Sequence, residues 1–314
     1  MAMNNKNYAI EINGLKKIYN FKKDNAFEAL KGINLNIPKQ SIFGLLGANG
    51  AGKSTLINII AGLVKKTEGK VSVWGNDIDN NERNAKLSIG VVPQELILDP
   101  FFTPRETLEY QSGYYGVPKK ENCVEEILES VGLSDKADAY ARSLSGGMRR
   151  RLMIGKAMVH RPPILILDEP TAGVDVALRQ SLWKEIKKLN KAGVTIILTT
   201  HYLEEAEAMC DSLAIVNKGK IVAEGQTNEM LNKLDKKELI ILLEDENANN
   251  IKLEDVDLEV LNNSLIKIAF KPSSINEGEI IEKIYKSGSK IKSINSKEPD
   301  LEELFLELTN NDVN

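Results

Sequence analysis

The chain has 314 residues, of which 42% are hydrophobic and 27% are charged; these fractions are ordinary for a globular protein and exclude disordered and fibrous classes. Its 41 basic and 45 acidic residues give a formal net charge of −4, so the composition points to neither nucleic acid nor anionic lipid as the main partner. The two cysteines, Cys123 and Cys210, are too few for a disulfide framework and suit a reducing compartment.

The apolar runs of the chain are short. The longest are 164–167, 194–198 and 239–243. All fall below the roughly 18–20 residues that a membrane-spanning helix needs. Residues 1–8 are polar and lack the apolar core of a secretory signal. We therefore expect a cytoplasmic protein that reaches the cytoplasmic face of a membrane only through another protein.

Apolar runs of strand length alternate with helical patterns from residue 8 to about residue 234. The expected strands are 41–46, 88–93, 164–168, 194–200 and 212–217. Several are apolar on both faces, which is typical of central strands covered by helices on each side. A helical pattern at 177–191 carries one apolar stripe. This alternation predicts an α/β domain with a mainly parallel sheet.

The composition changes near residue 232. From residue 235 onward the chain has no His, Cys or Trp and is rich in Lys, Glu, Asn and Ile. The patterns at 237–244, 258–270 and 277–285 predict a small α+β unit. We place the boundary near 233–238 and expect two domains, 8–235 and 236–314.

A glycine-rich segment follows the first expected strand. It consists of Gly47, Ala48, Asn49, Gly50, Ala51, Gly52, Lys53, Ser54 and Thr55, and it fits G-x-x-x-x-G-K-[ST] at every fixed position. The glycines let backbone N–H groups converge on an anion, and the following helix N-terminus adds partial positive charge. We expect Lys53 to bind the β- and γ-phosphates of a nucleotide and Ser54 to ligate Mg²⁺. A plain turn would need neither side chain.

Two acidic residues end the apolar strand 164–168. Asp168 and Glu169 are therefore expected at the carboxyl edge of the sheet, where α/β proteins place their ligands. Asp168 is suited to holding Mg²⁺. Because side chains alternate along a strand, Glu169 is expected to point the other way and to orient the attacking water. Without the phosphate loop, two acids capping a strand end in solvent would be an equal alternative.

A second glycine-containing segment consists of Leu144, Ser145, Gly146, Gly147 and Met148. Together with the two motifs above, it resembles the signature sequence of the ATP-binding cassette (ABC) ATPases. Gln94 resembles the residue of the family's glutamine loop, Asp175 that of its aspartate loop and His201 its switch histidine. The three occur in the family's order along the chain. Tyr19 is similar to the aromatic that stacks on adenine, with Phe21 and Phe27 as alternatives. The resemblance covers residues 8–234.

The resemblance implies an α/β P-loop NTPase fold, with a mainly parallel core sheet and a helical subdomain that carries the signature. It implies ATP and Mg²⁺ as cofactors, with Ser54, Gln94 and Asp168 at the metal. It implies Glu169 and His201 as catalytic residues, and a loop after Gln94 that contacts an integral membrane permease subunit.

The resemblance also implies a head-to-tail dimer with two-fold symmetry. Each ATP would lie between residues 47–55 of one copy and Ser145, Gly146 and Gly147 of the other. Ser145 is also expected to cap the helix that follows it. Asp175 has two compatible roles, capping its own helix and reaching across the dimer.

Three stretches, 90–103, 200–207 and the tail 300–309, resemble the branch of the family that serves ABC-2-type exporters, which includes drug and multidrug efflux ATPases. The signature ends in Met148, where the family's commonest residue is Gln, and this branch tolerates the change. Arg149, Arg150 and Arg151 follow. We expect them to form a solvated helix face, with phosphate steering as the alternative.

Three other classes compete with this interpretation. A P-loop GTPase would need a carboxylate in the guanine-binding N-K-x-D, and Lys220 stands there instead, so we expect residues 217–220 to form a turn between strands. A soluble ABC ATPase acting on a non-membrane partner usually carries two cassettes or a coiled-coil insertion. A non-catalytic binding module would need neither Glu169 nor His201. The transported substrate and the role of residues 235–314 stay open.

Overall fold

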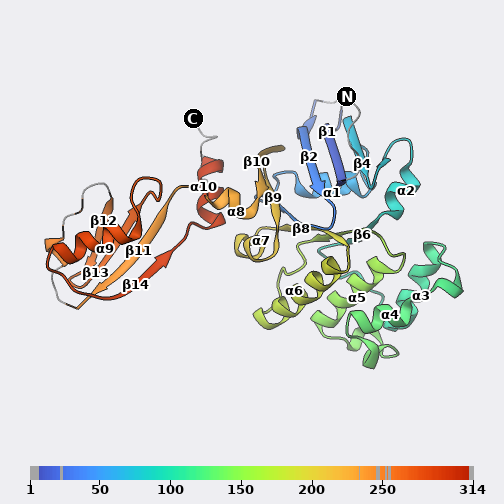
Figure 1. Ribbon diagram of the computed structural model, residues 1–314. Helices are drawn as coiled ribbons and strands as arrows, with labels where there is room; N and C mark the ends of the chain where they lie inside the picture. Colours follow the sequence, from blue (N-terminus) through green and yellow to red (C-terminus); the bar gives the residue numbers. More distant parts are fainter. Residues whose placement is uncertain are drawn as a thin grey trace. The chain divides into compact units, whose positions relative to one another are not determined.

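The computed structural model describes residues 7–21, 24–232, 234–244, 248–251, 253 and 256–310. The chain forms two units that divide between Gly225 and Gln226 (Figure 1). This division lies a little before the predicted limit at residue 235, and the predicted domain limits stay a prediction. Lys233, at the start of the predicted boundary, lies outside the described residues, as do residues 1–6 of the polar N-terminal segment.

The first unit begins with a four-stranded antiparallel sheet of order β2-β1-β4-β5. Its strands are β1 Tyr8–Tyr19, β2 Phe27–Pro38, β4 Glu68–Val73 and β5 Asn76–Asp77. We did not predict this sheet from the sequence. Bulges in the β1–β2 register, one of them between Ile12 and Leu15, break the period-two alternation that marks a strand.

The second sheet of this unit is six-stranded, in the order β10-β9-β3-β8-β7-β6. Its strands are β3 Ile42–Leu46, β6 Ile89–Val92, β7 Ile164–Asp168, β8 Thr195–Thr200, β9 Ser212–Asn217 and β10 Lys220–Gln226. Pairing from β9 through β3, β8 and β7 to β6 is parallel. The five predicted strands and the mainly parallel sheet are therefore confirmed. The loops that follow β3, β8, β7 and β6 all leave from one edge.

Helix α1 (Lys53–Ile60) lies between the two sheets (Figure 1). Its apolar residues join one core with side chains of both sheets. On the other face of the parallel sheet, α6 (Val176–Lys191) contacts β8, and α7 (Leu203–Met209) contacts β3 and β8. Cys210, just after α7, fills the space beside Gly44 of β3. The parallel sheet is thus covered on both faces, as its apolar strands require.

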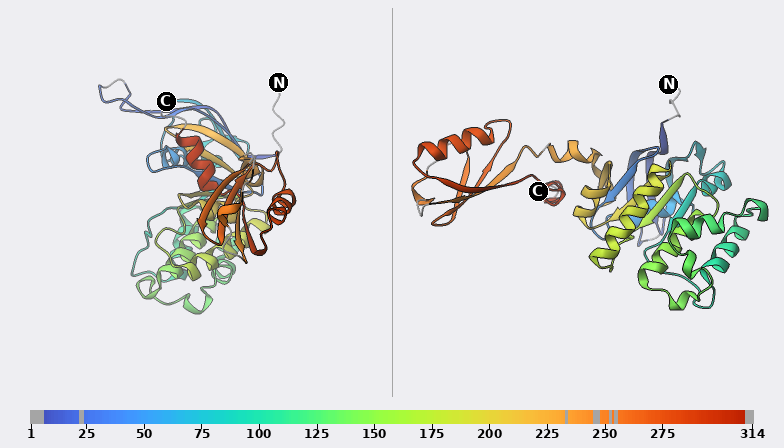
Figure 2. Two further views of the ribbon diagram at one scale, coloured as in Figure 1. Left: turned by 90° about the vertical axis from the view of Figure 1, so that its left-hand side faces the viewer. Right: turned by 60° about the horizontal axis from the view of Figure 1, so that its bottom comes forward.

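A helical part of the first unit has its own core (Figures 1 and 2). It contains α3 Pro104–Tyr114, α4 Val124–Ser130 and α5 Gly146–Met158, while α2 Glu82–Leu87 lies against β5 and β6. Thr103 and Glu106 form a capping box at the start of α3, which satisfies two N–H groups of that helix end. This part corresponds to the helical subdomain that the sequence resemblance implied.

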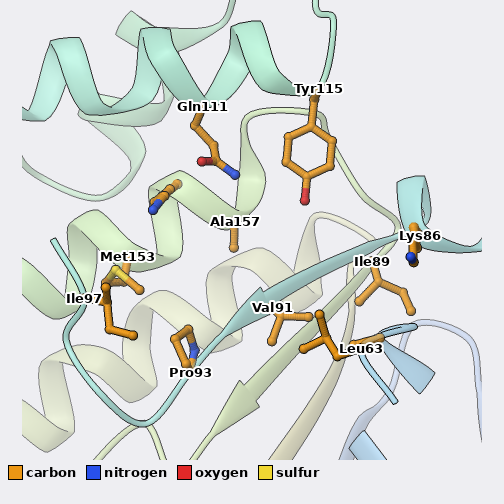
Figure 3. Close-up of a pocket in the computed structure, with 12 residues that line it drawn as sticks. Leu63, Lys86, Ile89, Val91, Pro93, Ile97, Gln111, Tyr115, Met153 and Ala157 are labelled. Atoms are coloured by element: carbon orange, nitrogen blue, oxygen red, sulfur yellow. The ribbon is translucent and has the colours of Figure 1, made fainter. Parts of the chain in front are cut away.

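A cavity of about 450 Å³ lies where β6 faces this helical part (Figure 3). Ile89, Val91 and Pro93 line one side, and Met153 and Ala157 of α5 line another. Two further lining residues, Leu63 and Ile97, are 71% and 64% exposed. The lining also includes Lys86, Gln111 and Lys156, so the cavity is mainly apolar, with some polar and charged side chains among its lining residues.

The second unit is a four-stranded antiparallel sheet with helices, in the strand order β12-β13-β11-β14. Its elements are α8 Thr227–Asn232, β11 Lys237–Leu243, β12 Asp257–Asn262, β13 Leu265–Phe270, α9 Glu277–Lys286, β14 Ile291–Lys297 and α10 Leu301–Asn310. Ile280 and Ile284 of α9 are fully buried in the core of this unit. The small α+β unit is confirmed. Across the described parts of both units, no helix has the length and apolarity to cross a bilayer.

Candidate functional site

Residues 47–55 connect the carboxyl end of β3 to α1. Gly47 has φ +153°, and a Cβ there would lie 2.4 Å from the carbonyl oxygen of Val216. Gly52 has φ +115°, and a Cβ there would lie 3.0 Å from the carbonyl oxygen of Ala29. Both positions need glycine for the backbone path and for the close approach of neighbouring backbone. The segment is therefore a fixed loop with its N–H groups at a helix N-terminus, which fits a phosphate group.

Lys53, the first residue of α1, is only 6% exposed. Its Nζ donates hydrogen bonds to the carbonyl oxygens of Gly47 at 2.5 Å and Ala48 at 3.2 Å. Burial lowers the pKa of Lys53 below its ordinary value, and the charges of Glu169 and Asp168 oppose that effect. The loop thus encloses an ammonium group that an entering anion would neutralise. Ser54 follows in the first helical turn and is exposed.

Asp168 is the last residue of β7, and Glu169 is the first residue beyond the strand. Asp168 ends β7 and accepts a hydrogen bond from Thr199 Oγ1 at 2.5 Å. Glu169 has φ +45°, and its N–H donates to the carbonyl oxygen and the hydroxyl of Thr199 at 3.1 and 3.0 Å. A left-handed conformation costs an L-residue roughly 1–2 kcal/mol, which these bonds offset. Our argument from strand alternation was wrong, because Glu169 lies beyond the strand.

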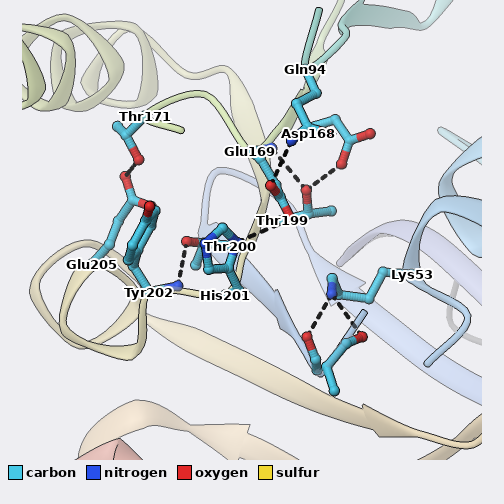
Figure 4. A network of polar contacts seen from close by, with 12 residues as sticks. Lys53, Gln94, Asp168, Glu169, Thr171, Thr199, Thr200, His201, Tyr202 and Glu205 are labelled. Atoms are coloured by element: carbon cyan, nitrogen blue, oxygen red, sulfur yellow. Dashed lines mark hydrogen bonds and ion pairs between the residues drawn. The ribbon is translucent and has the colours of Figure 1, made fainter. Parts of the chain in front are cut away.

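The carboxylate of Glu169 is held from both sides. Gln94 Nε2 donates to Glu169 Oε2 at 2.9 Å, and His201 Nδ1 lies 3.2 Å from Oε1 (Figure 4). Gln94 follows β6 and His201 follows β8, and these strands flank β7 in the sheet. The strand order therefore brings Gln94, Glu169 and His201 together, although the chain separates them widely.

The signature residues lie at a different helix end. Ser145 Oγ accepts from Met148 N at 3.3 Å and caps α5, and Asp175 Oδ1 accepts from Leu178 N at 2.9 Å and caps α6. A Cβ on Gly147 would meet Leu178 at 2.3 Å, so the two helix N-termini pack side by side. Both capping roles are confirmed. Within the described residues, no hydrogen bond or ion pair joins 145–147 to the phosphate loop of the same chain.

Tyr19 lies close to the first turn of α1. Its hydroxyl is 3.5 Å from Thr55 Oγ1, and Lys17 Nζ lies 4.7 Å from the centre of its ring. Phe27 pairs with Tyr19 across the two strands and is 60% exposed, and Phe21 is 54% exposed. Tyr19 itself is half-buried, and its adenine-stacking role stays a prediction.

The expectation that Arg149, Arg150 and Arg151 form a solvated face is wrong. Arg150 is 4% exposed, and its guanidinium donates to the carbonyl oxygens of Pro93 at 3.1 Å and Gln94 at 2.9 Å. Burial lowers the pKa of Arg150. Arg149 donates to the carbonyl of Arg142, and Arg151 to those of Val131 and Gly132. Arg150 thus ties the signature helix to the backbone of Gln94.

Replacing Arg150 by methionine is expected to lower the free energy of unfolding by about 1–3 kcal/mol, because two carbonyl groups lose their buried donor. Arg149→Met, which loses a bond to one carbonyl at a more accessible position, is expected to change it by less than about 1 kcal/mol. Urea unfolding of both variants measures the difference. Equal stabilities would show that the bonds from Arg150 contribute nothing net.

Sequence analysis missed Thr199 and Glu205. Thr199 is one of three threonines in β8, with Thr195 and Thr200, and only the pairing of β8 with β7 places it beside Asp168. Glu205 lies in α7, four residues after His201 in the chain, and it accepts hydrogen bonds from Thr171 and Trp183. Nothing in the local sequence separates Glu205 from its acidic neighbours Glu204 and Glu207.

The known proteins that this chain resembles in sequence are described as ABC transporter or ATP-binding proteins. The sequence profile described as ABC transporter matches residues 30–172. The chain is 35% identical over 310 residues to the linearmycin resistance ATP-binding protein of Bacillus subtilis (strain 168), covering 96% of this chain and 98% of that protein. It is 40% identical over 225 residues to the Nod factor export ATP-binding protein I of Rhizobium sp. (strain N33), covering 71% and 72% respectively.

Two solved structures share the fold of the first unit. One is a dimeric ATP-binding cassette in a post-hydrolysis state bound to ADP and Pi, with a TM-score of 0.62 and 27% identity, covering 69% of this chain and 98% of that chain. The other is CbiO1 from Clostridium perfringens, part of an ABC transporter complex, with a TM-score of 0.65 and 28% identity, covering 73% and 95%.

Proposed function

The chain belongs to the ABC transporter family, and on that premise we propose that it is the ATP-hydrolysing subunit of an ABC-2-type exporter, with drug or multidrug efflux as the form of export. As a member of this family it is an ATPase that uses ATP with Mg²⁺. The names of two relatives, which refer to linearmycin resistance and Nod factor export, support the outward direction.

The network around Glu169 carries the proposal. We assign Lys53 to the β- and γ-phosphates. We assign Ser54, Gln94 and Asp168 to Mg²⁺, because their hydroxyl, amide and carboxylate oxygens are hard ligands of the kind that ion prefers. Mg²⁺ supplies neutralisation of the charge that develops on the phosphates. Glu169 orients and polarises the attacking water. His201 hydrogen-bonds the γ-phosphate and holds the geometry around Glu169. Gln94 and His201 keep the Glu169 carboxylate in place through the contacts described above.

A second chain completes the proposed site. Ser145, Gly146 and Gly147 form a helix N-terminus at which Ser145 and Gly146 are exposed and Gly147 is buried. Such a helix end attracts anions, and no hydrogen bond or ion pair in the described residues joins it to the phosphate loop of its own chain. A head-to-tail pair would place this segment on the ATP held by the partner's phosphate loop, twice by symmetry. Asp175 would approach the same interface, since α5 and α6 begin side by side.

We also propose that the membrane subunit binds beside β6. The mainly apolar cavity there adjoins the segment that begins at Gln94, and exposed Leu63 and Ile97 extend its apolar surface. Burying such side chains in a partner stabilises the complex by about 25 cal/mol per Å² of apolar area. A partner on this surface would touch the segment that begins at Gln94, and Gln94 bonds Glu169. A movement of the partner would therefore reach Glu169.

The Glu169→Gln variant is expected to form a stable dimer with ATP and Mg²⁺, because slowed hydrolysis keeps the shared polyanion in place. Size-exclusion chromatography with light scattering measures the mass. Adding Gly146→Asp should keep the protein monomeric, since it places a negative charge at the anion-binding helix end, while no atom lies within 4 Å of a Cβ at that position. A monomeric mass of Glu169→Gln at saturating ATP would contradict head-to-tail pairing.

A further inference from the structure

Glu205 is a buried carboxylate that the proposed chemistry does not use. It lies in α7 and is 1% exposed. Its Oε1 accepts hydrogen bonds from Thr171 Oγ1 at 2.8 Å and Trp183 Nε1 at 2.9 Å. Its Oε2 is buried and has no hydrogen-bond partner in the described part of the chain. A buried carboxylate oxygen without a hydrogen-bond partner costs free energy. The two hydrogen bonds to Oε1 are therefore expected to have a function that offsets this cost.

The partners of Glu205 lie next to the catalytic candidates. Thr171 is two residues after Glu169, in the segment that leaves β7. Glu205 is four residues after His201, in the segment that leaves β8. These two segments are therefore joined at two points, His201 to Glu169 and Glu205 to Thr171 (Figure 4). The first contact is partly open to solvent, since the His201 side chain is 41% exposed, whereas the second is buried.

We propose that Glu205 is a positioning residue, which fixes the segment carrying His201 against the segment carrying Glu169. This inference rests on the proposed roles of His201 and Glu169. A buried bond holds its geometry better than an exposed one, because water does not compete for it. Small displacements of catalytic groups cost large factors in rate, so the Thr171–Glu205 bond keeps the exposed His201–Glu169 contact within working distance.

The chemistry of the carboxylate suits this task. An ionised carboxylate only accepts hydrogen bonds, so Thr171 and Trp183 can both donate to one oxygen without a competing donor. Trp183 comes from α6, so Glu205 also anchors its segment to a long helix. Glutamine retains the accepting oxygen and the size of the side chain, and is therefore the conservative replacement.

The test compares substitutions at the two ends of the buried bond. Thr171→Val removes the hydroxyl but keeps the shape, and is expected to lower kcat for ATP at least about tenfold with KM within about twofold of wild type. Thr171→Ser keeps the hydroxyl and should restore most of kcat. Glu205→Ala should behave like Thr171→Val, and Glu205→Gln should retain more activity than Glu205→Ala. Where Glu205→Ala fails to fold, the valine and serine pair at residue 171 carries the test.

A double-mutant cycle with His201→Ala separates positioning from a general structural defect. If Thr171→Val acts through His201, the two substitutions together should cost much less than the product of their separate effects on kcat. Losses of kcat that multiply in the double variant would overturn the positioning role alone. The same holds if Thr171→Val and Glu205→Ala are fully active while His201→Ala is impaired. Full activity of His201→Ala would overturn it together with the proposed role of His201.

Discussion

Replacing Glu169 by glutamine is expected to slow ATP turnover by at least about 100-fold, the lower end for loss of a general base. The amide has nearly the shape of the carboxylate, and its oxygen can still accept the hydrogen bond from Gln94. The site is therefore expected to keep its geometry and its affinity for ATP. What the variant loses is the negative charge that polarises the attacking water, which is a property of the transition state and not of the bound nucleotide.

Steady-state phosphate release and calorimetric titration with ATP measure these two quantities for Glu169→Gln. Glu204→Gln provides a matched control, because Glu204 is an exposed carboxylate in the first turn of α7. Its kcat should stay within about twofold of wild type, as exposed charges contribute little. Turnover near wild type in Glu169→Gln would remove Glu169 from the reaction. Loss of ATP binding would instead show that the carboxylate is needed to hold the site together.

The central sheet and the phosphate loop could be predicted because their signals are local. Strands β3 and β7 are short, mainly apolar runs, and β8 has three apolar residues between threonines; all three strands are buried on both faces. The loop of residues 47–55 has glycines at positions that its backbone requires. The gathering of Gln94, Glu169 and His201 was also accessible from the sequence, since each residue follows a strand of a parallel sheet. The order of those strands came from the structure.

The remaining features depend on partners far away in the chain. Arg150 looks like one of three surface arginines until the carbonyls of Pro93 and Gln94 meet it. Glu169 has a left-handed backbone conformation, and Thr199 of the neighbouring strand accepts a hydrogen bond from its N–H. Glu205 is buried by Thr171 and Trp183 from two other segments. Periodicity and local motifs carry no information on such contacts, which form only when the tertiary structure overrides local preference.

Replacing Lys53 by alanine is expected to weaken ATP binding at least about tenfold, because one charge-assisted hydrogen bond contributes roughly 1.5–3 kcal/mol and Lys53 is assigned to two phosphates. The ammonium is buried in the loop and already faces the carbonyls of Gly47 and Ala48. No other cation of the loop segment 47–55 can replace it, since Lys53 is its only basic residue.

Calorimetry with a non-hydrolysable ATP analogue and Mg²⁺ measures the affinity of Lys53→Ala directly, without interference from turnover. Lys184→Ala is the matched control, because Lys184 is an exposed lysine of α6 where alanine suits the helix. Melting temperatures of both variants check the fold, as Lys53→Ala also removes two hydrogen bonds to the loop. An unchanged affinity for ATP in a folded Lys53→Ala protein would contradict the role of the buried charge. The phosphates would then be held by the backbone N–H groups of the glycine-rich loop and of the helix end, without Lys53.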